Sequence, residues 1–231
     1  MKNTTNTVYT LETFYCENKK VKPQILENLS KINNEYTKNK DFIGYKNEIQ
    51  KCFDLSSVKI DKNCRFYLAG FIEGEGSINV SLKKVPNGKI LVDPEFSITQ
   101  HINGISNLYL ALCLFQTGRI RYKIGSNATF VYSIDNRRSL DEKIIPFYEK
   151  YVIIYGSLHK KERFKSFKRL LQHLNEKDHL NTEKMVYEIL PLWDKMRMQI
   201  GQENKTFKDL KEAQNYVSPN LLHHQCSNEH L

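Results

Sequence analysis

The sequence contains, once, the stretch Leu68-Ala69-Gly70-Phe71-Ile72-Glu73-Gly74-Glu75-Gly76. Its small residues allow two helix backbones to approach more closely than ordinary side chains would permit. Gly74 and Gly76 stand where they would end a helix, whose C-terminus carries unsatisfied carbonyls and the negative end of the helix dipole. Because Glu75 adds a carboxylate there, this helix end is suited to a hard divalent cation such as Mg2+.

The residues around this stretch support more than a simple helix cap. A buried helix ending in glycine would account for Leu-Ala-Gly alone. Here Phe66 and Tyr67 precede the stretch, and the strand-like segment 77–84 follows it at once. The sequence therefore indicates a helix that runs directly into a strand.

Length and charge limit the possible functions. At 231 residues the chain can hold one generous domain, or a domain with an appendage. Its net charge of +9 points to a polyanionic partner, although many basic proteins bind nothing in particular. The segment 160–169 is more telling, because it holds six cations and one acid.

Cysteine usage and hydropathy exclude other classes of protein. The five cysteines are odd in number and include no Cys-x-x-Cys pair, which favours a reducing compartment over a disulfide framework or a zinc ribbon. No apolar run is long enough to span a membrane. The start of the chain lacks the apolar core of a signal peptide and the Arg-rich character of a transit peptide.

Periodicity predicts an α+β fold. Helical spacing of apolar residues over 22–55 indicates a helical N-terminal appendage, 1–58, and Asp61 is placed to cap the motif helix, which should end near Glu73. A core domain over 59–200 and a C-terminal helical segment with a tail over 201–231 complete the expected organisation. The core elements expected are strands 77–84 and 89–100, helix 105–115, strands 118–124 and 128–134, and helices 140–152, 159–174 and 182–199. Pro191 should kink or restart the last helix. The order predicts an antiparallel four-stranded sheet.

One face of this sheet is predicted to bind DNA. Strand alternation puts polar residues opposite Ile78, Val80 and Leu82 in one hairpin and opposite Ile120 and Tyr122 in the other. Arg and Asn are the residues that read guanine and adenine edges. Acids on this face could accept from a cytosine amine or face solvent. The predicted DNA-contacting residues are Ser77, Asn79, Ser81, Lys83, Asp93, Glu95, Ser97, Arg119, Arg121, Lys123, Asn127 and Thr129.

The stretch 68–76 resembles the motif after which the LAGLIDADG homing endonucleases are named. Glu73 and Glu75 stand at the two positions where that name has aspartate. The order of elements over about 62–200 is similar to the αββαββα core of this family, whose four-stranded sheet is saddle-shaped. Later strings resemble the intron-encoded enzymes of chloroplast large-subunit ribosomal RNA genes, among them 92–101, 118–121, 125–129, 134–137 and 145–148. Family members with one motif are homodimers, so the resemblance implies a dimer joined through Ala69, Gly70, Glu73 and Gly74.

The resemblance also implies a set of site residues. The metal-binding acid of the family falls on Glu75, beside the carbonyl of Gly74, and two or three Mg2+ or Mn2+ ions per dimer are expected. Gln100 falls where a polar residue orders the hydrolytic water. Lys160 or Lys161 corresponds to the lysine that stabilises the scissile phosphate. The implied activity is metal-dependent cleavage of double-stranded DNA across the minor groove, with 3′ overhangs, at a long pseudo-palindromic target.

Two alternative functions and a cellular origin follow from the same resemblance. Some family members are RNA maturases, but a splicing helper has no need of Glu75. Others are transcription regulators that join a degraded motif to a helix-turn-helix, and no such signature follows residue 140. The chain is rich in Asn, Lys, Ile and Tyr, whose codons are rich in A and T. An AT-rich organelle genome would favour this composition, and so would many bacterial genomes. With the chloroplast relatives, we expect a chloroplast-encoded protein.

Overall fold

The computed structural model describes residues 15–17, 19–86, 89–197 and 206–218. Within these, the chain forms two compact units, one from residues up to Ser77 with Ser97–Ile134, the other from Ile78–Phe96 with the residues after Ile134. The boundary passes through two strands, β3 (Gly76–Val85) and β4 (Lys89–His101). Asn87 and Gly88, between the two strands expected over 77–84 and 89–100, lie outside the described residues, as does the expected tail beyond residue 218.

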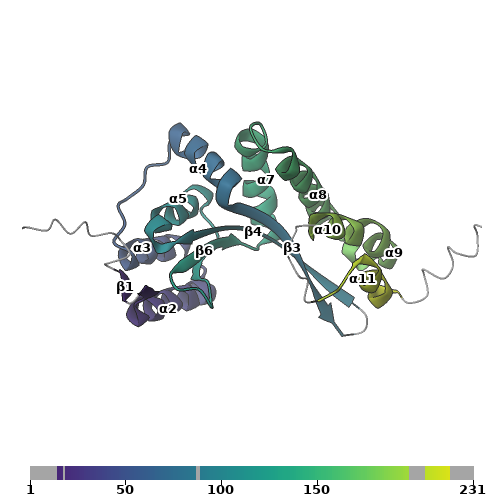
Figure 1. Ribbon diagram of the computed structural model, residues 1–231, viewed down its shortest axis with the longest axis horizontal. Helices are drawn as coiled ribbons and strands as arrows, with labels where there is room; N and C mark the ends of the chain where they lie inside the picture. Colours follow the sequence, from purple (N-terminus) through teal and green to yellow (C-terminus); the bar gives the residue numbers. More distant parts are fainter. Residues whose placement is uncertain (1–14, 18, 87–88, 198–205, 219–231) are drawn as a thin grey trace, which may run out of the picture. The chain divides into compact units, whose positions relative to one another are not determined.

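The element order confirms the expected core (Figure 1). One sheet has four strands in the order β3-β4-β6-β5, and β5 pairs with β6 in antiparallel fashion. The first unit further contains β1 (Cys16–Glu17), β2 (Lys20–Val21), α2 (Pro23–Asn39), α3 (Phe42–Cys52), α4 (Lys62–Glu75), α5 (Ile105–Phe115), β5 (Arg119–Tyr122) and β6 (Thr129–Ile134).

The second unit is built mainly from helices. They are α6 (Arg137–Ser139), α7 (Ile145–Phe147), α8 (Leu158–Asn175), α9 (Thr182–Lys184), α10 (Leu190–Arg197) and α11 (Leu210–Val217), with π-helical turns at Leu140–Ile144, Tyr148–Val152 and Met185–Ile189. The π turn Met185–Ile189 ends two residues before Pro191, whose nitrogen carries no hydrogen and cannot donate a backbone hydrogen bond. Helical residues run without a break from Thr182 to Arg197, so the helix does not restart at Pro191, and its hydrogen-bond pattern changes from π to α at the preceding residue, Leu190.

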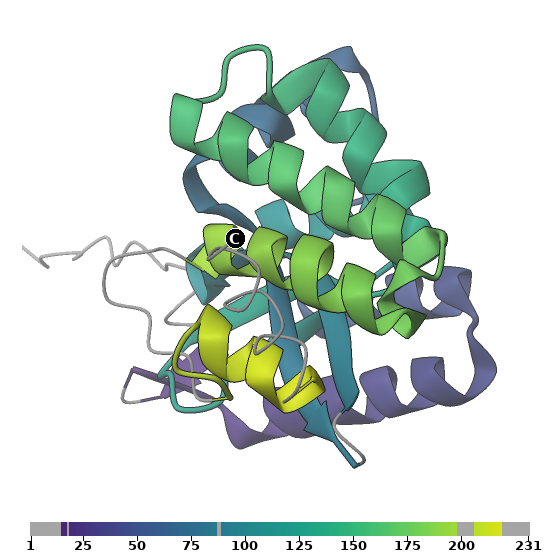
Figure 2. The ribbon, with the colours of Figure 1, turned by 90° about the vertical axis from the view of Figure 1, so that its right-hand side faces the viewer.

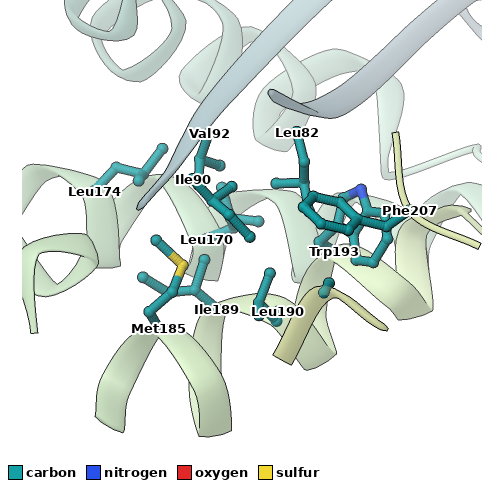
Figure 3. Packing of buried hydrophobic residues seen from close by; sticks show 11 residues of the cluster. Leu82, Ile90, Val92, Leu170, Leu174, Met185, Ile189, Leu190, Trp193 and Phe207 are labelled. Carbon is teal, nitrogen blue, oxygen red and sulfur yellow. The ribbon is translucent and has the colours of Figure 1, made fainter. Parts of the chain in front are cut away.

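Helix α10 lies between α8 and α11 (Figure 2). Its residues Leu190 and Trp193 belong to the hydrophobic core of this unit. Leu82, Ile90 and Val92 of the β3–β4 hairpin pack with Leu170 of α8 and Trp193 of α10 (Figure 3). The C-terminal segment contributes further residues, Phe207 and Ala213. The alternation predicted for β3 is confirmed, since Ile78 and Leu82 are buried.

The segment 206–218 is fastened to the hairpin by a lysine. The ammonium of Lys84 lies 4.7 Å from the ring centroid of Phe207 and 5.5 Å from that of Tyr216. The same lysine pairs with Glu212 at 3.4 Å, and the Tyr216 hydroxyl donates to the Val85 carbonyl at 2.7 Å. Lys84 therefore acts as a structural cation on β3.

The N-terminal helices protect an exposed strand edge in the first unit. The Tyr45 hydroxyl accepts the backbone N–H of Ile120 at 2.8 Å, and the Asn33 side chain donates to the Ile120 carbonyl at 3.0 Å. Tyr45 and Asn33 also bond to each other at 3.2 Å. Edge strands with unpaired backbone groups invite aggregation, and here side chains from α2 and α3 occupy that edge of β5.

Changing Tyr45 to Phe tests this edge cap. The variant leaves the buried N–H of Ile120 without its acceptor, so the free energy of unfolding should fall by about 1–3 kcal/mol. Urea denaturation followed by circular dichroism measures the loss. Changing Tyr155 to Phe provides a matched control, because Tyr155 is 79% exposed and its variant should unfold like the parent. Equal stability of both variants would show that Tyr45 does not cap the strand.

Candidate functional site

Asp61 and Gly76 stand at the two ends of the motif helix α4. The Asp61 side chain accepts the backbone N–H of Cys64 at 2.8 Å, which confirms the predicted cap. The helix ends at Glu75, two residues beyond the expected Glu73. Gly76 then turns the chain into β3 with φ −80°, an extended conformation open to any residue. Glycine is needed there for space, since an added Cβ would lie 2.7 Å from the Ile72 carbonyl oxygen.

Helix α4 buries one side and leaves the other open. Leu68, Ala69 and Ile72 pack inside the chain. At Gly70 and Gly74 an added Cβ would meet nothing within 4 Å. The described part of the chain therefore gives no packing reason for glycine at either position. Exposed aromatic side chains flank these glycines, with Phe66 and Tyr67 respectively 44% and 54% exposed.

Glu75 lies exposed at the end of this helix, among its C-terminal carbonyls. This set of hard oxygen donors fits Mg2+ or Mn2+ better than a softer metal. One carboxylate is too few to hold such an ion firmly, so further oxygens from a substrate or a second chain are required.

Gln100 occupies the end of β4, and its side chain lies against Gly104. A Cβ added at Gly104 would approach the Gln100 Oε1 to 2.6 Å. Gly104 thus leaves room for the Gln100 carboxamide, which is itself only partly exposed. The absence of a side chain at residue 104 therefore lets the predicted water-ordering residue keep its position.

The predicted lysines stand in the first turn of α8. The Ser157 hydroxyl caps this helix by accepting the Lys160 backbone N–H at 3.4 Å. Lys160 and Lys161 are both half-buried. Further along, Lys165 pairs with Glu162 at 2.7 Å and Lys168 pairs with Glu149. The cationic segment is therefore partly neutralised by the chain itself.

The strand residues predicted to contact DNA divide into two groups. On β3, Ser77, Asn79, Ser81 and Lys83 lie opposite the buried positions, as expected. Lys83 pairs with Asp93 of β4, and this hydrogen bond raises the pKa of Lys83. The pairing gives Asp93 a partner on the predicted DNA face that the sequence did not reveal.

In the other hairpin, each arginine has a partner. The Arg119 guanidinium donates to the Thr37 hydroxyl of α2 at 3.1 Å, and the Arg121 guanidinium donates to the Ser133 hydroxyl at 2.5 Å. Arg121, Lys123 and Asn127 are exposed, whereas Arg119 and Thr129 are half-buried. These contacts support the arginine side chains in defined positions.

A second group of potential metal ligands lies in α8 and the turn after it. Among the described residues, His173, Glu176 and Asp178 offer ligand atoms within 4.8 Å of one another. Asp178 already binds the ammonium of Lys184 at 2.6 Å and the ring of His173 at 2.8 Å. The Lys184 and His173 hydrogen bonds lower the pKa of Asp178. The ammonium of Lys184 therefore takes the place that a metal ion would have in this cluster. We assign the cluster a structural role at the C-terminal end of α8.

Comparison with known proteins identifies the family. The LAGLIDADG endonuclease family matches residues 68–171. The DNA endonuclease I-CeuI of Chlamydomonas moewusii is 49% identical over 194 residues, which cover 83% of this chain and 89% of that protein. The chain belongs to the LAGLIDADG endonucleases.

Solved structures agree with this assignment. The group I intron-encoded homing endonuclease I-CeuI, complexed with DNA, superposes with a TM-score of 0.83 at 46% identity, covering 87% of this chain and 99% of that one. The archaeal intron-encoded homing endonuclease I-Vdi141I, complexed with DNA, gives 0.59 at 30% identity, covering 67% and 94%. The expected LAGLIDADG fold is thereby confirmed. LAGLIDADG endonucleases depend in general on divalent metal ions.

Two predicted site residues of this LAGLIDADG endonuclease are less accessible than the sequence suggested. Ser97 is 8% exposed, because residues 96–98 of β4 are all buried and the strict alternation fails there. Ala69 is 4% exposed and packs inside its own chain. A predicted contact through either side chain would therefore need a local rearrangement, whereas Gly70 and Gly74 offer open surface.

One of the six cations counted in the segment 160–169, Arg163, differs from its neighbours in its contacts. Arg163 turns inward and donates from Nε to the Ile78 carbonyl at 2.8 Å, and from its terminal nitrogens to the Met196 carbonyl and the Asn79 side chain. Burial lowers the pKa of Arg163. A run of alternating cations cannot reveal which one is buried, because the partners lie far away in the chain.

Changing Gly104 to Ala tests the role of Gln100. The added methyl group should push the Gln100 carboxamide aside at little cost in stability, because only the far end of a flexible side chain has to move. We expect DNA cleavage to slow by about ten- to a hundredfold. Single-turnover kinetics measures the change, with the exposed Ser106→Ala on α5 as the control. An unchanged rate with Ala at residue 104 would remove Gln100 from the site.

Proposed function

We propose that this chain is a site-specific homing endonuclease that acts as a homodimer on a long, pseudo-palindromic DNA target. The observation that carries this proposal is the open glycine face of α4, with Glu75 exposed at its end. The similarity to I-CeuI, an intron-encoded homing endonuclease solved with DNA, supports it.

The dimer follows from the packing of α4. Gly70 and Gly74 lie one helical turn apart, and such small residues allow a second helix to approach closely. The exposed Phe66 and Tyr67 would also be covered by a second copy. Because a twofold axis uses the same surface on both chains, the two α4 ends would bring two Glu75 carboxylates together.

DNA recognition rests on charge and on the polar strand face. The net charge of +9 favours a polyanion, and affinity should fall steeply with salt. Exposed Arg121, Lys123 and Asn127 in the second hairpin suit base edges or phosphates. Two copies of the sheet would follow about two helical turns, roughly 20 base pairs.

Metal-dependent hydrolysis of a phosphodiester bond gives each proposed site residue a role. Glu75 and the carbonyl of Gly74 would hold two or three Mg2+ or Mn2+ ions per dimer with the DNA phosphates. Such ions lower the pKa of bound water and neutralise charge on the phosphate. Gln100 would orient the attacking water, and Lys160 or Lys161 would stabilise the charge on the scissile phosphate. Each chain would cut one strand across the minor groove, leaving 3′ overhangs.

The biological setting is proposed from the same relatives. A homing endonuclease cuts an allele that lacks its intron and so promotes the spread of that intron. Since I-CeuI is described as group I intron-encoded, we place this chain in the same class, acting on a ribosomal RNA gene. We propose an organelle, the chloroplast, as the site of its synthesis.

Changing Glu75 to Gln should separate cleavage from binding. The amide keeps the size of the side chain but removes the charge that holds the divalent ion, so cleavage should fall below detection while specific binding survives. Plasmid cleavage in Mg2+ and gel-shift titration measure the two activities. Glu73→Gln is the matched control and should affect cleavage less per folded dimer. Normal cleavage by the Glu75→Gln variant would refute the metal assignment.

Substituting Gly70 tests the dimer without disturbing the fold. Within the part of the single chain that the structure describes, a Cβ at residue 70 meets nothing within 4 Å, so Gly70→Leu should fold normally. In a dimer packed through α4 the leucine would overpack the interface and dissociate it. Gly70→Ala should have a smaller effect. Sedimentation velocity measures the state of each variant, and a stable parental monomer of 27.2 kDa, unchanged by target DNA, would contradict the proposal.

A further inference from the structure

Arg163 has a different environment from the other cations of α8. Lys165, Lys168 and Arg169 are exposed, whereas Arg163 lies partly buried in the second unit. All three of its hydrogen-bond acceptors within the described residues are neutral: the carbonyls of Ile78 and Met196, and the amide oxygen of Asn79. A buried cation is costly unless its donors are satisfied. The planar guanidinium fork satisfies them by joining β3 to the end of α10.

The bond to Asn79 fixes the direction of a side-chain amide. An asparagine side chain has a carbonyl oxygen that accepts and an NH2 group that donates. If the Asn79 amide were turned over, its NH2 group would face the guanidinium, which has donors only. The structure thus keeps Oδ1 toward Arg163, so that Nδ2 remains the donor of this side chain, on the strand face opposite the buried Ile78.

This orientation matters for base recognition. Asparagine that is free to use both ends reads adenine by accepting from N6 and donating to N7. An amide whose oxygen is held by a cation is left mainly as a donor. Guanine, adenine and thymine each present a major-groove acceptor, whereas cytosine presents only its amino donor.

We propose that Arg163 is a positioning residue for specificity: it holds Asn79 as a hydrogen-bond donor toward DNA and so excludes cytosine at the base that Asn79 contacts. The inference rests on the proposed function, because it requires that this face of β3 meets DNA. Arg163 itself touches no base. It acts on recognition through the amide that it orients.

A base-by-base specificity profile tests the proposal. A preferred target is first selected from a pool of random DNA duplexes with the parental protein. Affinities are then measured for every single base-pair substitution, for the parental protein, Arg163→Met and Asn79→Ala. In Arg163→Met the amide can turn over, so discrimination against cytosine should fall about tenfold at one position in each half-site. That position should be the one at which Asn79→Ala loses its preference.

Controls separate positioning from structural support. Lys165→Met removes another α8 cation, which pairs only with Glu162 among the described residues, and should leave the profile unchanged. Arg163→Lys keeps a donor at the same place and should restore part of the discrimination. A uniform loss of affinity across all substitutions in Arg163→Met would show a purely structural role and overturn the proposal.

A second variant keeps the test decisive if Arg163→Met fails to fold. Asn79→Asp retains an acceptor for Arg163 but has no donor, so the preference at the same position should shift toward cytosine. An unshifted preference would overturn the inference. A parental protein that selects no target at all would instead refute the proposed function, so the two failures are distinguishable.

Discussion

The proposed function depends on one constraint, the close approach of a second helix that the open face of α4 permits. Among the described residues, a Cβ added at Gly70 or Gly74 would meet nothing within 4 Å, although glycine weakens a helix interior by about 1 kcal/mol relative to alanine. Such a cost is understandable where another backbone must come near. Glu75 ends the same helix, and Gly76 passes the chain into β3 past the Ile72 carbonyl. The residues proposed for assembly, for metal binding and for the first DNA-contacting strand therefore follow one another directly in the chain.

Several positively charged side chains of this protein bind other parts of the chain. Lys84 holds the C-terminal segment, Arg163 joins β3 to helices, and Lys83 pairs with Asp93. Exposed pairs of this last kind contribute little stability but hold side chains in place. Net charge alone overstates the surface available to DNA. Structural cations next to recognition residues can instead set their orientation, as we propose for Arg163.

Much of the fold could be predicted because its signals are local. The Asp61 cap, helix 105–115 and the alternation of Ile78 and Leu82 each follow from residues a few positions apart. The motif itself predicted the family. Within the candidate site, the exposed position of Glu75 agrees with the sequence, and the metal and DNA roles remain predictions.

Other features depend on residues far apart in the chain, which periodicity cannot reveal. The edge cap joins Tyr45 to Ile120, and the partly buried guanidinium of Arg163 binds the side chain of Asn79. Ser97 was assigned to the open face because alternation was extended through β4, yet residues 96–98 of this strand are all buried. Helix end positions also shifted, since Gly74 continues α4 and only Gly76 ends it.

The central claim is that each chain of a dimer supplies one Glu75 for one DNA strand. A mixed dimer with one parental chain and one Glu75→Gln chain, isolated through two different affinity tags, tests it most directly. The products on a target labelled separately on each strand are then measured in Mg2+. The account predicts a nick in one strand, with the other left intact. Cleavage of both strands at the parental rate would contradict it.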